Sequence, residues 1–167
     1  MKKILTIFSL FLALSLNVYA DKMEMIDTNG THYNVVAEGD DIKIEGMEGK
    51  VVFLEFFGLK CPACREEMPH LINLQKKYPN KLKIMAIEVQ KNDNDPINAF
   101  KKLHGINYTT FSNFDVGFVV RYIADKSNWQ GAIPFMVAID SKGKVQFTQA
   151  GIIDEQTLEK HIENFSK

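Results

Sequence analysis

The two cysteines of this 167-residue chain lie three positions apart, in the segment Cys61-Pro62-Ala63-Cys64. They follow an apolar run at 51–57, which predicts a buried strand that opens into a helix. A cysteine at the start of a helix lies among unpaired N–H groups, at the positive end of the helix dipole, and both favour its thiolate. The second cysteine is within bridging reach of the first. The spacing therefore predicts thiol-disulfide exchange, in which Cys61 attacks and Cys64 resolves.

The first twenty residues have the pattern of an export signal. Lys2 and Lys3 precede an apolar stretch at 4–16, and Val18-Tyr19-Ala20 forms a small-residue cleavage pattern. The stretch is short for a membrane span, and no later run of about 18 apolar residues follows, so we expect a protein that is not embedded in the membrane. We expect residues 1–20 to be a signal peptide, 21–167 to be one domain and the bacterial periplasm to be the destination.

Charge and cysteine spacing narrow the function further. The formal net charge of −1 becomes −3 when the two leader lysines are removed, which argues against a nucleic-acid partner. A purely structural disulfide is the alternative for two exported cysteines. However, closing a four-residue loop removes only roughly 2 kcal/mol of unfolded-chain entropy, against about 3 kcal/mol for fifteen residues. The spacing favours redox chemistry over stabilisation.

Hydrophobic periodicity and turn residues divide the domain into alternating elements. Strand-like pieces at 33–36 and 41–45, separated by turn residues, predict an N-terminal β-hairpin. A strand at 49–57, a helix from 62 to about 77 and a strand at 82–89 then form a strand-helix-strand unit.

The second half of the domain continues this alternation. Asp95, followed by Pro96, is the expected N-cap of a helix that ends at Gly105. We then expect, in order, a strand at 108–111, a helix at 115–122, a polar loop at 124–131, strands at 135–139 and 145–148, and a closing helix capped by Asp154. These elements predict an α/β fold, a three-layer sandwich whose central mixed sheet carries helices on both faces.

This arrangement resembles the thioredoxin superfamily. The shared features are the strand, the Cys-x-x-Cys motif at a helix start, a proline five residues after the second cysteine, and Ile133-Pro134 just before a strand. Pro69 then corresponds to the proline inside that family's active-site helix, and Pro134 to its cis-proline. The resemblance implies that the backbone of Ile133 turns towards the cysteines, where it can pair with an incoming peptide.

More residues separate Cys64 from Pro134 than in plain thioredoxins, which implies an inserted strand and helix before the cis-proline. The insertion is similar to that of exported TlpA/ResA reductases, many of which serve cytochrome c maturation. This resemblance implies that Glu67 shuttles protons and that Glu55 stands in the place of the buried acid of thioredoxin. It also implies exported protein disulfides, such as those of apocytochrome c, as substrates, and a membrane thiol-disulfide electron transporter as donor. No cofactor is expected.

Two other functions stay open at this point. TlpA-like proteins commonly have tryptophan and threonine where this chain has Lys60 and Ile133, and Glu-Phe-Phe before Cys-Pro resembles the periplasmic disulfide oxidase. An oxidase or isomerase is therefore the alternative, because the direction of electron flow depends on how readily Cys61 ionises. A copper or zinc chaperone of the same fold is less favoured. Its ligand set is incomplete, since the four histidines show no ligand spacing with the cysteines, and no metal site is expected.

Overall fold

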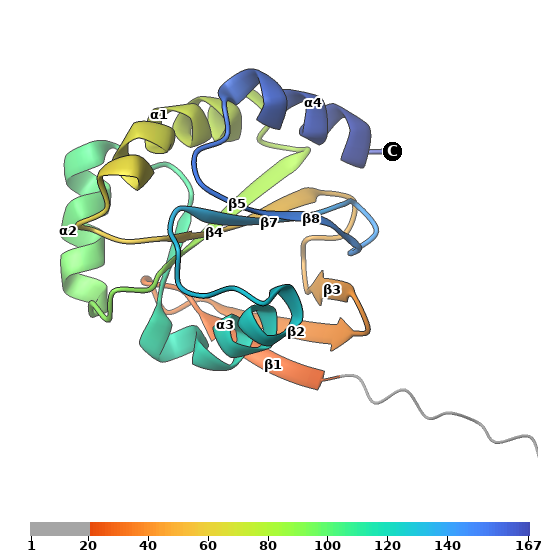
Figure 1. Cartoon of the computed structure of the whole chain (residues 1–167), viewed down its shortest axis with the longest axis horizontal. Coiled ribbons are helices and arrows are strands. Elements are labelled where there is room, and N and C mark those ends of the chain that lie inside the picture. Colours follow the sequence, from red (N-terminus) through yellow and green to blue (C-terminus); the bar gives the residue numbers. More distant parts are fainter. Residues whose placement is uncertain (1–20) are drawn as a thin grey trace, which may run out of the picture.

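A mixed five-stranded sheet runs through the centre of the protein (Figure 1). The computed structural model describes residues 21–167, so the predicted signal peptide lies outside the described residues. The strand order is β6-β5-β4-β7-β8. Strands β4 (Val51–Phe57), β5 (Leu82–Glu88) and β6 (Thr109–Ser112) pair in parallel, whereas β7 (Phe135–Ile139) pairs antiparallel with both β4 and β8 (Val145–Ala150).

Strand β4 is buried along its whole length because both faces of the sheet are covered. Val51, Phe53 and Phe57 pack with the helices α1 (Pro62–Lys77) and α4 (Glu155–Phe165). The alternate residues of β4 pack with α3 (Asn113–Ser127) and a small N-terminal sheet. This is the period-two pattern of a strand between two cores. The three-layer thioredoxin-like architecture predicted from the sequence is confirmed, with α1 and α4 above the sheet in Figure 1 and α3 below it.

The N-terminal sheet has three strands instead of the predicted two. The predicted hairpin is present as β2 (His32–Glu38) and β3 (Asp41–Ile44). In addition, β1 (Asp21–Ile26) pairs with β2 along its full length. Backbone hydrogen bonds attach this sheet to the central one, from Thr28 N–H to the Thr110 carbonyl (2.9 Å) and from Ile42 N–H to the Gly143 carbonyl (2.8 Å).

Two helices differ from their predicted bounds. Helix α2 (Asn94–His104) begins one residue before Asp95, with Asp93 as N-cap. Pro96 therefore lies within the first turn of the helix. A missing N–H is tolerated at each position of that turn, so the proline did not identify the first residue of the helix. Helix α3 extends to Ser127, through part of the predicted loop. The prediction ended this helix too early because its last turn carries polar residues and continues no apolar stripe. Its N-cap Ser112 accepts a hydrogen bond from the Phe114 N–H (3.3 Å).

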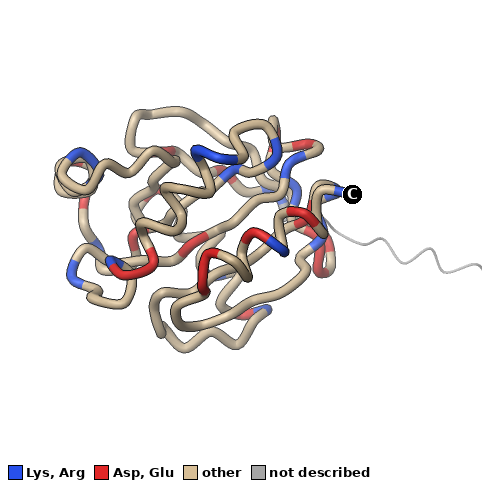
Figure 2. The backbone as a smooth tube through the Cα atoms, turned by 90° about the horizontal axis from the view of Figure 1, so that it is seen from above, with Lys and Arg blue, Asp and Glu red and all other residues tan. Residues whose placement is uncertain are grey.

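Polar contacts join α1 to α4 across the top of the sheet. Glu159 pairs with Lys77 and accepts a hydrogen bond from the Tyr78 hydroxyl (2.5 Å), while the Asn73 amide donates to Glu155 (3.2 Å). Seen from above, basic residues occur on several elements and alternate with acidic ones (Figure 2). These contacts join the C-terminal half of α1 to the N-terminal half of α4.

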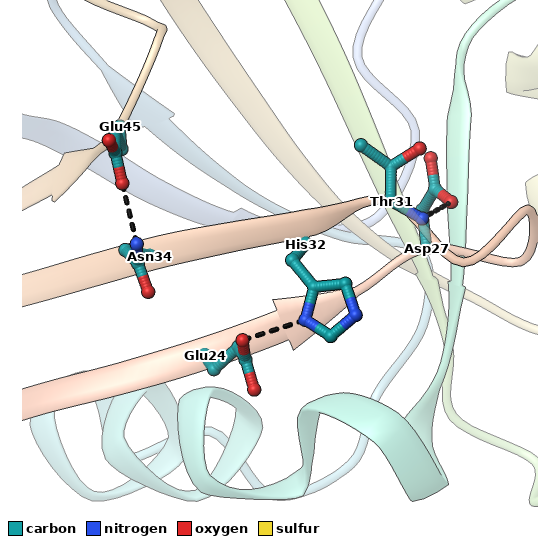
Figure 3. A network of polar contacts seen from close by, with 6 residues as sticks. All are labelled: Glu24, Asp27, Thr31, His32, Asn34 and Glu45. Atoms are coloured by element: carbon teal, nitrogen blue, oxygen red, sulfur yellow. Dashed lines mark hydrogen bonds and ion pairs between the residues drawn. The ribbon is translucent and has the colours of Figure 1, made fainter.

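Asp27 organises the turn between β1 and β2 (Figure 3). It is only 4% exposed, and its Oδ1 accepts hydrogen bonds from the backbone N–H groups of Asn29 and Thr31, both at 2.9 Å. Glu24 and His32 on the same sheet form an exposed pair with an Oε1–Nδ1 distance of 2.8 Å. The buried carboxylate and the exposed pair are neighbours in one sheet but differ in their surroundings.

We expect Asp27→Ala to lower the free energy of unfolding by about 1–3 kcal/mol, because two turn N–H groups lose their acceptor in a covered site. Urea denaturation of the oxidised protein measures the difference. Glu24→Ala is the matched control and should change stability by less than about 0.5 kcal/mol, since exposed ion pairs contribute little. Equal losses in the two variants would contradict the structural role assigned to Asp27.

Candidate active site

Cys61 and Cys64 form a disulfide at the start of α1, with their Cα atoms 5.3 Å apart. Cys61 is the N-cap residue, and its Sγ accepts a hydrogen bond from the Cys64 backbone N–H at 3.1 Å. Pro62 occupies the beginning of the helix, where its missing N–H costs no hydrogen bond. The sulfur of Cys61 thus lies where helix N–H groups and the helix dipole stabilise negative charge.

The peptide bond between Ile133 and Pro134 is cis, as the resemblance to thioredoxins implied. It brings the Ile133 carbonyl oxygen to 3.8 Å from Cys61 Sγ, although the two residues are 72 positions apart. Both cysteines belong to a buried apolar cluster against which Leu59 and Ile133 pack. The backbone that lies beside Cys61 Sγ therefore belongs to the loop before β7.

Trp129 supports this loop, a role that sequence analysis did not assign. Its indole N–H donates a hydrogen bond to the Ala132 carbonyl at 2.7 Å. Its ring packs against Phe56 and Phe135, with centroid distances of 4.9 Å and 5.6 Å. The signal available in the sequence was a single tryptophan four residues before Ile133. Its packing against β4 became visible only with the sheet assembled.

Glu55 on β4 and Glu67 on α1 are the two acids brought together inside the core. Glu55 is 3% exposed and Glu67 is 1% exposed. The backbone N–H of Ile153 donates a hydrogen bond to Glu67 Oε1 at 2.9 Å. One further oxygen of each carboxyl, Oε2, is buried without a hydrogen-bond partner among the described residues. Because successive strand residues point to opposite faces, Glu55 lies on the face of β4 opposite to Leu54 and Phe56.

The surroundings of the two acids shift their pKa values to different extents. Burial raises the pKa of Glu55 well above its usual range, and the neighbouring Glu67 carboxyl raises it further. Burial also raises the pKa of Glu67, but the Ile153 N–H, the Glu55 carboxyl and His70 lower it in part. Burial near both acids raises the pKa of the Tyr108 hydroxyl as well. Glu55 therefore keeps its proton to higher pH than Glu67 does.

Residues 21–167 contain neither a candidate metal site nor a candidate membrane-spanning helix. No group of three His, Cys, Asp or Glu side chains in this range is placed to hold a metal ion. No helix in the same range has the length and apolar character needed to cross a membrane.

A family model described as the AhpC/TSA family matches residues 22–148. The chain belongs to this family. It is 30% identical over 152 residues to the thiol-disulfide oxidoreductase ResA of Bacillus thuringiensis (strain Al Hakam), an alignment that covers 89% of this chain and 82% of the relative. The ResA protein of Bacillus subtilis (strain 168) is 27% identical over 149 residues, covering 87% and 79%. The predicted ResA-like resemblance is confirmed, and the protein is a thiol-disulfide oxidoreductase.

Solved structures show the same fold. A thiol:disulfide interchange protein of the thioredoxin family from Chlorobium tepidum TLS superposes with a TM-score of 0.68 at 18% identity, covering 89% of this chain and 95% of that one. StoA from Bacillus subtilis superposes with a TM-score of 0.62 at 14% identity, covering 86% and 98%. At these identities the likeness establishes the thioredoxin-like fold of this AhpC/TSA family member.

We expect the stability of oxidised Glu55→Gln, relative to the wild type, to rise between pH 4 and pH 8, by up to about 1.4 kcal/mol for each pH unit over which only the folded protein holds the Glu55 proton. The folded protein holds a proton on Glu55 that the unfolded chain releases above its ordinary pKa of 4.5, so wild-type stability falls as pH rises from there towards the folded-state pKa. An amide removes that loss. Urea denaturation between pH 4 and pH 8 measures the change.

The gain from Glu55→Gln should shrink towards zero below pH 4.5, where the carboxyl is neutral in both states. Glu66→Gln, on the exposed side of helix α1, is the control and should show no pH-dependent difference. A stability difference for Glu55→Gln that stays constant from pH 4 to pH 8 would rule out the protonation argument.

Proposed function

We propose that this oxidoreductase is an exported periplasmic reductase that reduces disulfides of exported proteins, such as apocytochrome c during cytochrome c maturation. One observation carries the proposal: the Cys61–Cys64 disulfide caps α1 beside the cis Ile133–Pro134 bond. The names of the relatives support the thiol-disulfide exchange part of the proposal, and the signal-like pattern at 1–20 supports export.

The reaction begins with an extended substrate peptide that pairs with the backbone of Ile133. The Cys61 thiolate attacks one sulfur of the substrate disulfide and forms a mixed disulfide, while the other substrate sulfur leaves as a thiolate and takes a proton. Cys64 then attacks Cys61 Sγ. The second substrate sulfur leaves, and the protein dithiol has become a disulfide after delivering two electrons.

The resolving step needs a base, because Cys64 lies in an apolar cluster that disfavours its ionised form. Glu67 is the acid of the buried pair that ionises more readily, and it lies one helical turn after Cys64 on α1. Glu67 takes the Cys64 proton in this scheme. Glu55 holds its own proton against Glu67 and so limits the charge that accumulates in the core.

The direction of transfer distinguishes this proposal from the disulfide oxidase alternative. A reductase in an oxidising compartment needs a donor, and a membrane thiol-disulfide electron transporter supplies the electrons that regenerate the dithiol. An oxidase would instead receive its oxidising power from the membrane. Both directions use the same sulfur chemistry, so the reduction potential and the identity of the partners separate them.

We expect Cys64→Ser to accumulate mixed disulfides through Cys61 in the source organism, because the resolving thiol is absent. Non-reducing gels of a periplasmic fraction followed by mass spectrometry identify the partners. Apocytochromes among them support the maturation role. A broad set of secreted proteins without apocytochromes would contradict it and favour the oxidase.

Two controls accompany the trapping experiment. Cys61→Ser should trap no partner, because the attacking sulfur is gone. Equilibration of the wild-type protein with glutathione should give a potential below about −200 mV, on the reducing side of the range of disulfide oxidoreductases. A potential near about −120 mV, that of a strong oxidant, would overturn the reductase direction.

We expect Glu67→Gln to slow insulin disulfide reduction at pH 7 by about 10²-fold, the lower end of what a positioned base contributes. The loss should shrink as pH rises to 9, because hydroxide then removes the Cys64 proton without help. Rates measured across this pH range test the role, and Glu66→Gln should match the wild type throughout. A pH-independent loss for Glu67→Gln would indicate damage to packing instead.

A further inference from the structure

The segment after β5 contacts the turn that leads from β4 to Cys61. This turn is residues 58–60, and its ends are joined by a hydrogen bond from the Cys61 N–H to the Gly58 carbonyl at 3.1 Å. The side chain of Gln90, thirty positions after Lys60, reaches the turn. Its Oε1 accepts a hydrogen bond from the Lys60 backbone N–H at 3.0 Å. The residue directly before Cys61 is thus held by an acceptor from another strand end.

Gln90 also occupies the space beside Gly58. A Cβ atom at position 58 would lie 2.3 Å from Gln90 Cδ and 2.5 Å from its Oε1, which is closer than any real contact allows. A side chain at position 58 would therefore displace the Gln90 side chain packed on it. Gln90 touches both ends of the turn, Gly58 by packing and Lys60 by a hydrogen bond.

A buried carboxylate holds Gln90 in this position. Glu88, at the end of β5, is fully buried and accepts hydrogen bonds from the Gln90 N–H (3.1 Å), the Asn92 N–H (2.9 Å) and the Asn92 side-chain amide (2.8 Å). Between them, Lys91 has a φ of 64°, a left-handed conformation that costs energy for a residue with a side chain. Three hydrogen bonds to one carboxylate maintain this bend, and the bend directs Gln90 towards Gly58.

The turn is also tied to β5 directly before Gln90. The Val89 N–H donates to the Phe57 carbonyl at 2.9 Å, which continues the pairing of β4 and β5 by one residue. On the other side of Gln90, the Asn92 carbonyl accepts a hydrogen bond from the Ser112 hydroxyl at 2.8 Å. Gln90 therefore projects from a backbone that is fixed on both sides, and it transmits that position to the turn before Cys61.

We propose that Gln90 is a positioning residue for the nucleophile, which holds the 58–60 turn so that Cys61 Sγ stays aligned with the first N–H groups of α1. This assignment concerns the exchange chemistry at Cys61 and does not depend on the identity of the substrate. Without the Gln90 acceptor, the Lys60 N–H loses its partner and the turn moves. The Cys61 thiolate then loses part of its stabilisation by the helix start.

The test measures alkylation of Cys61 in the reduced protein by iodoacetamide between pH 4 and pH 9. Gln90→Met keeps the length and packing of the side chain but removes the acceptor oxygen. We expect its rate at neutral pH to fall about three- to tenfold, as the loss of one hydrogen bond permits, and the midpoint of the pH profile to move upward. The reduction potential should become more negative, since a less stable thiolate makes the protein a weaker oxidant.

Gly58→Ala tests the same contact from the opposite side. It leaves the Gln90 amide intact but displaces it by steric overlap, so it should shift the alkylation profile in the same direction. Gln156→Met, on the exposed surface of α4, is the matched control and should keep the wild-type profile. Thermal unfolding verifies that each variant is folded. A wild-type pH profile in folded Gln90→Met or in folded Gly58→Ala would overturn the assignment.

The assay separates this inference from the proposed function. The pH profile of alkylation by iodoacetamide depends on the ionisation and access of Cys61, and not on the compartment, the donor or the substrate. A shifted profile with no trapped apocytochromes would support the role of Gln90 while removing the maturation role, and an unshifted profile with trapped apocytochromes would do the reverse.

Discussion

The burial of β4 on both faces determines where the groups of the active site lie. Because successive residues of a strand point to opposite faces, the strand sends Glu55 towards α1 and Phe56 towards Trp129. The same strand then ends beside β5, where the 58–60 turn meets Gln90. A shift of β4 by one residue would exchange its two faces, place Phe56 against α1 and remove Glu55 from Glu67. The acid pair and the support of the cis-proline loop therefore depend on one register.

The buried acid pair lowers the stability of the folded protein. Two carboxyl groups in a low-dielectric core cannot both ionise readily, and unpartnered polar atoms in such a place lower stability. The Ile153 N–H is directed at the pair, and it donates its hydrogen bond to Glu67. The result is an asymmetric pair in which the strand residue retains its proton and the helix residue ionises more readily. Such an arrangement can accept and return a proton without a full second charge in the core.

Periodicity and turn chemistry predicted most of the fold, because each element of the central sheet carries its own local signal. The Cys-x-x-Cys spacing predicted the exchange site in the same way, from residues close together in the chain. What the sequence could not reveal were contacts between distant segments. Strand β1 forms against a partner strand, and Trp129 and Gln90 act on the site through single hydrogen bonds to backbone atoms, which leave no pattern in composition or spacing.

The two cysteines differ in their surroundings, and this difference gives the exchange its order. Cys61 caps the helix, so its sulfur receives the Cys64 N–H and the field of the helix start, which favour negative charge. Cys64 lies inside the helix within an apolar cluster, on the same helix as the Glu67 carboxylate, and both features disfavour a second negative charge there. In the proposed mechanism the first sulfur attacks as a thiolate, whereas the second ionises only when a base removes its proton. The position of the disulfide at the start of α1 therefore supports the proposed order, in which Cys61 attacks and Cys64 resolves.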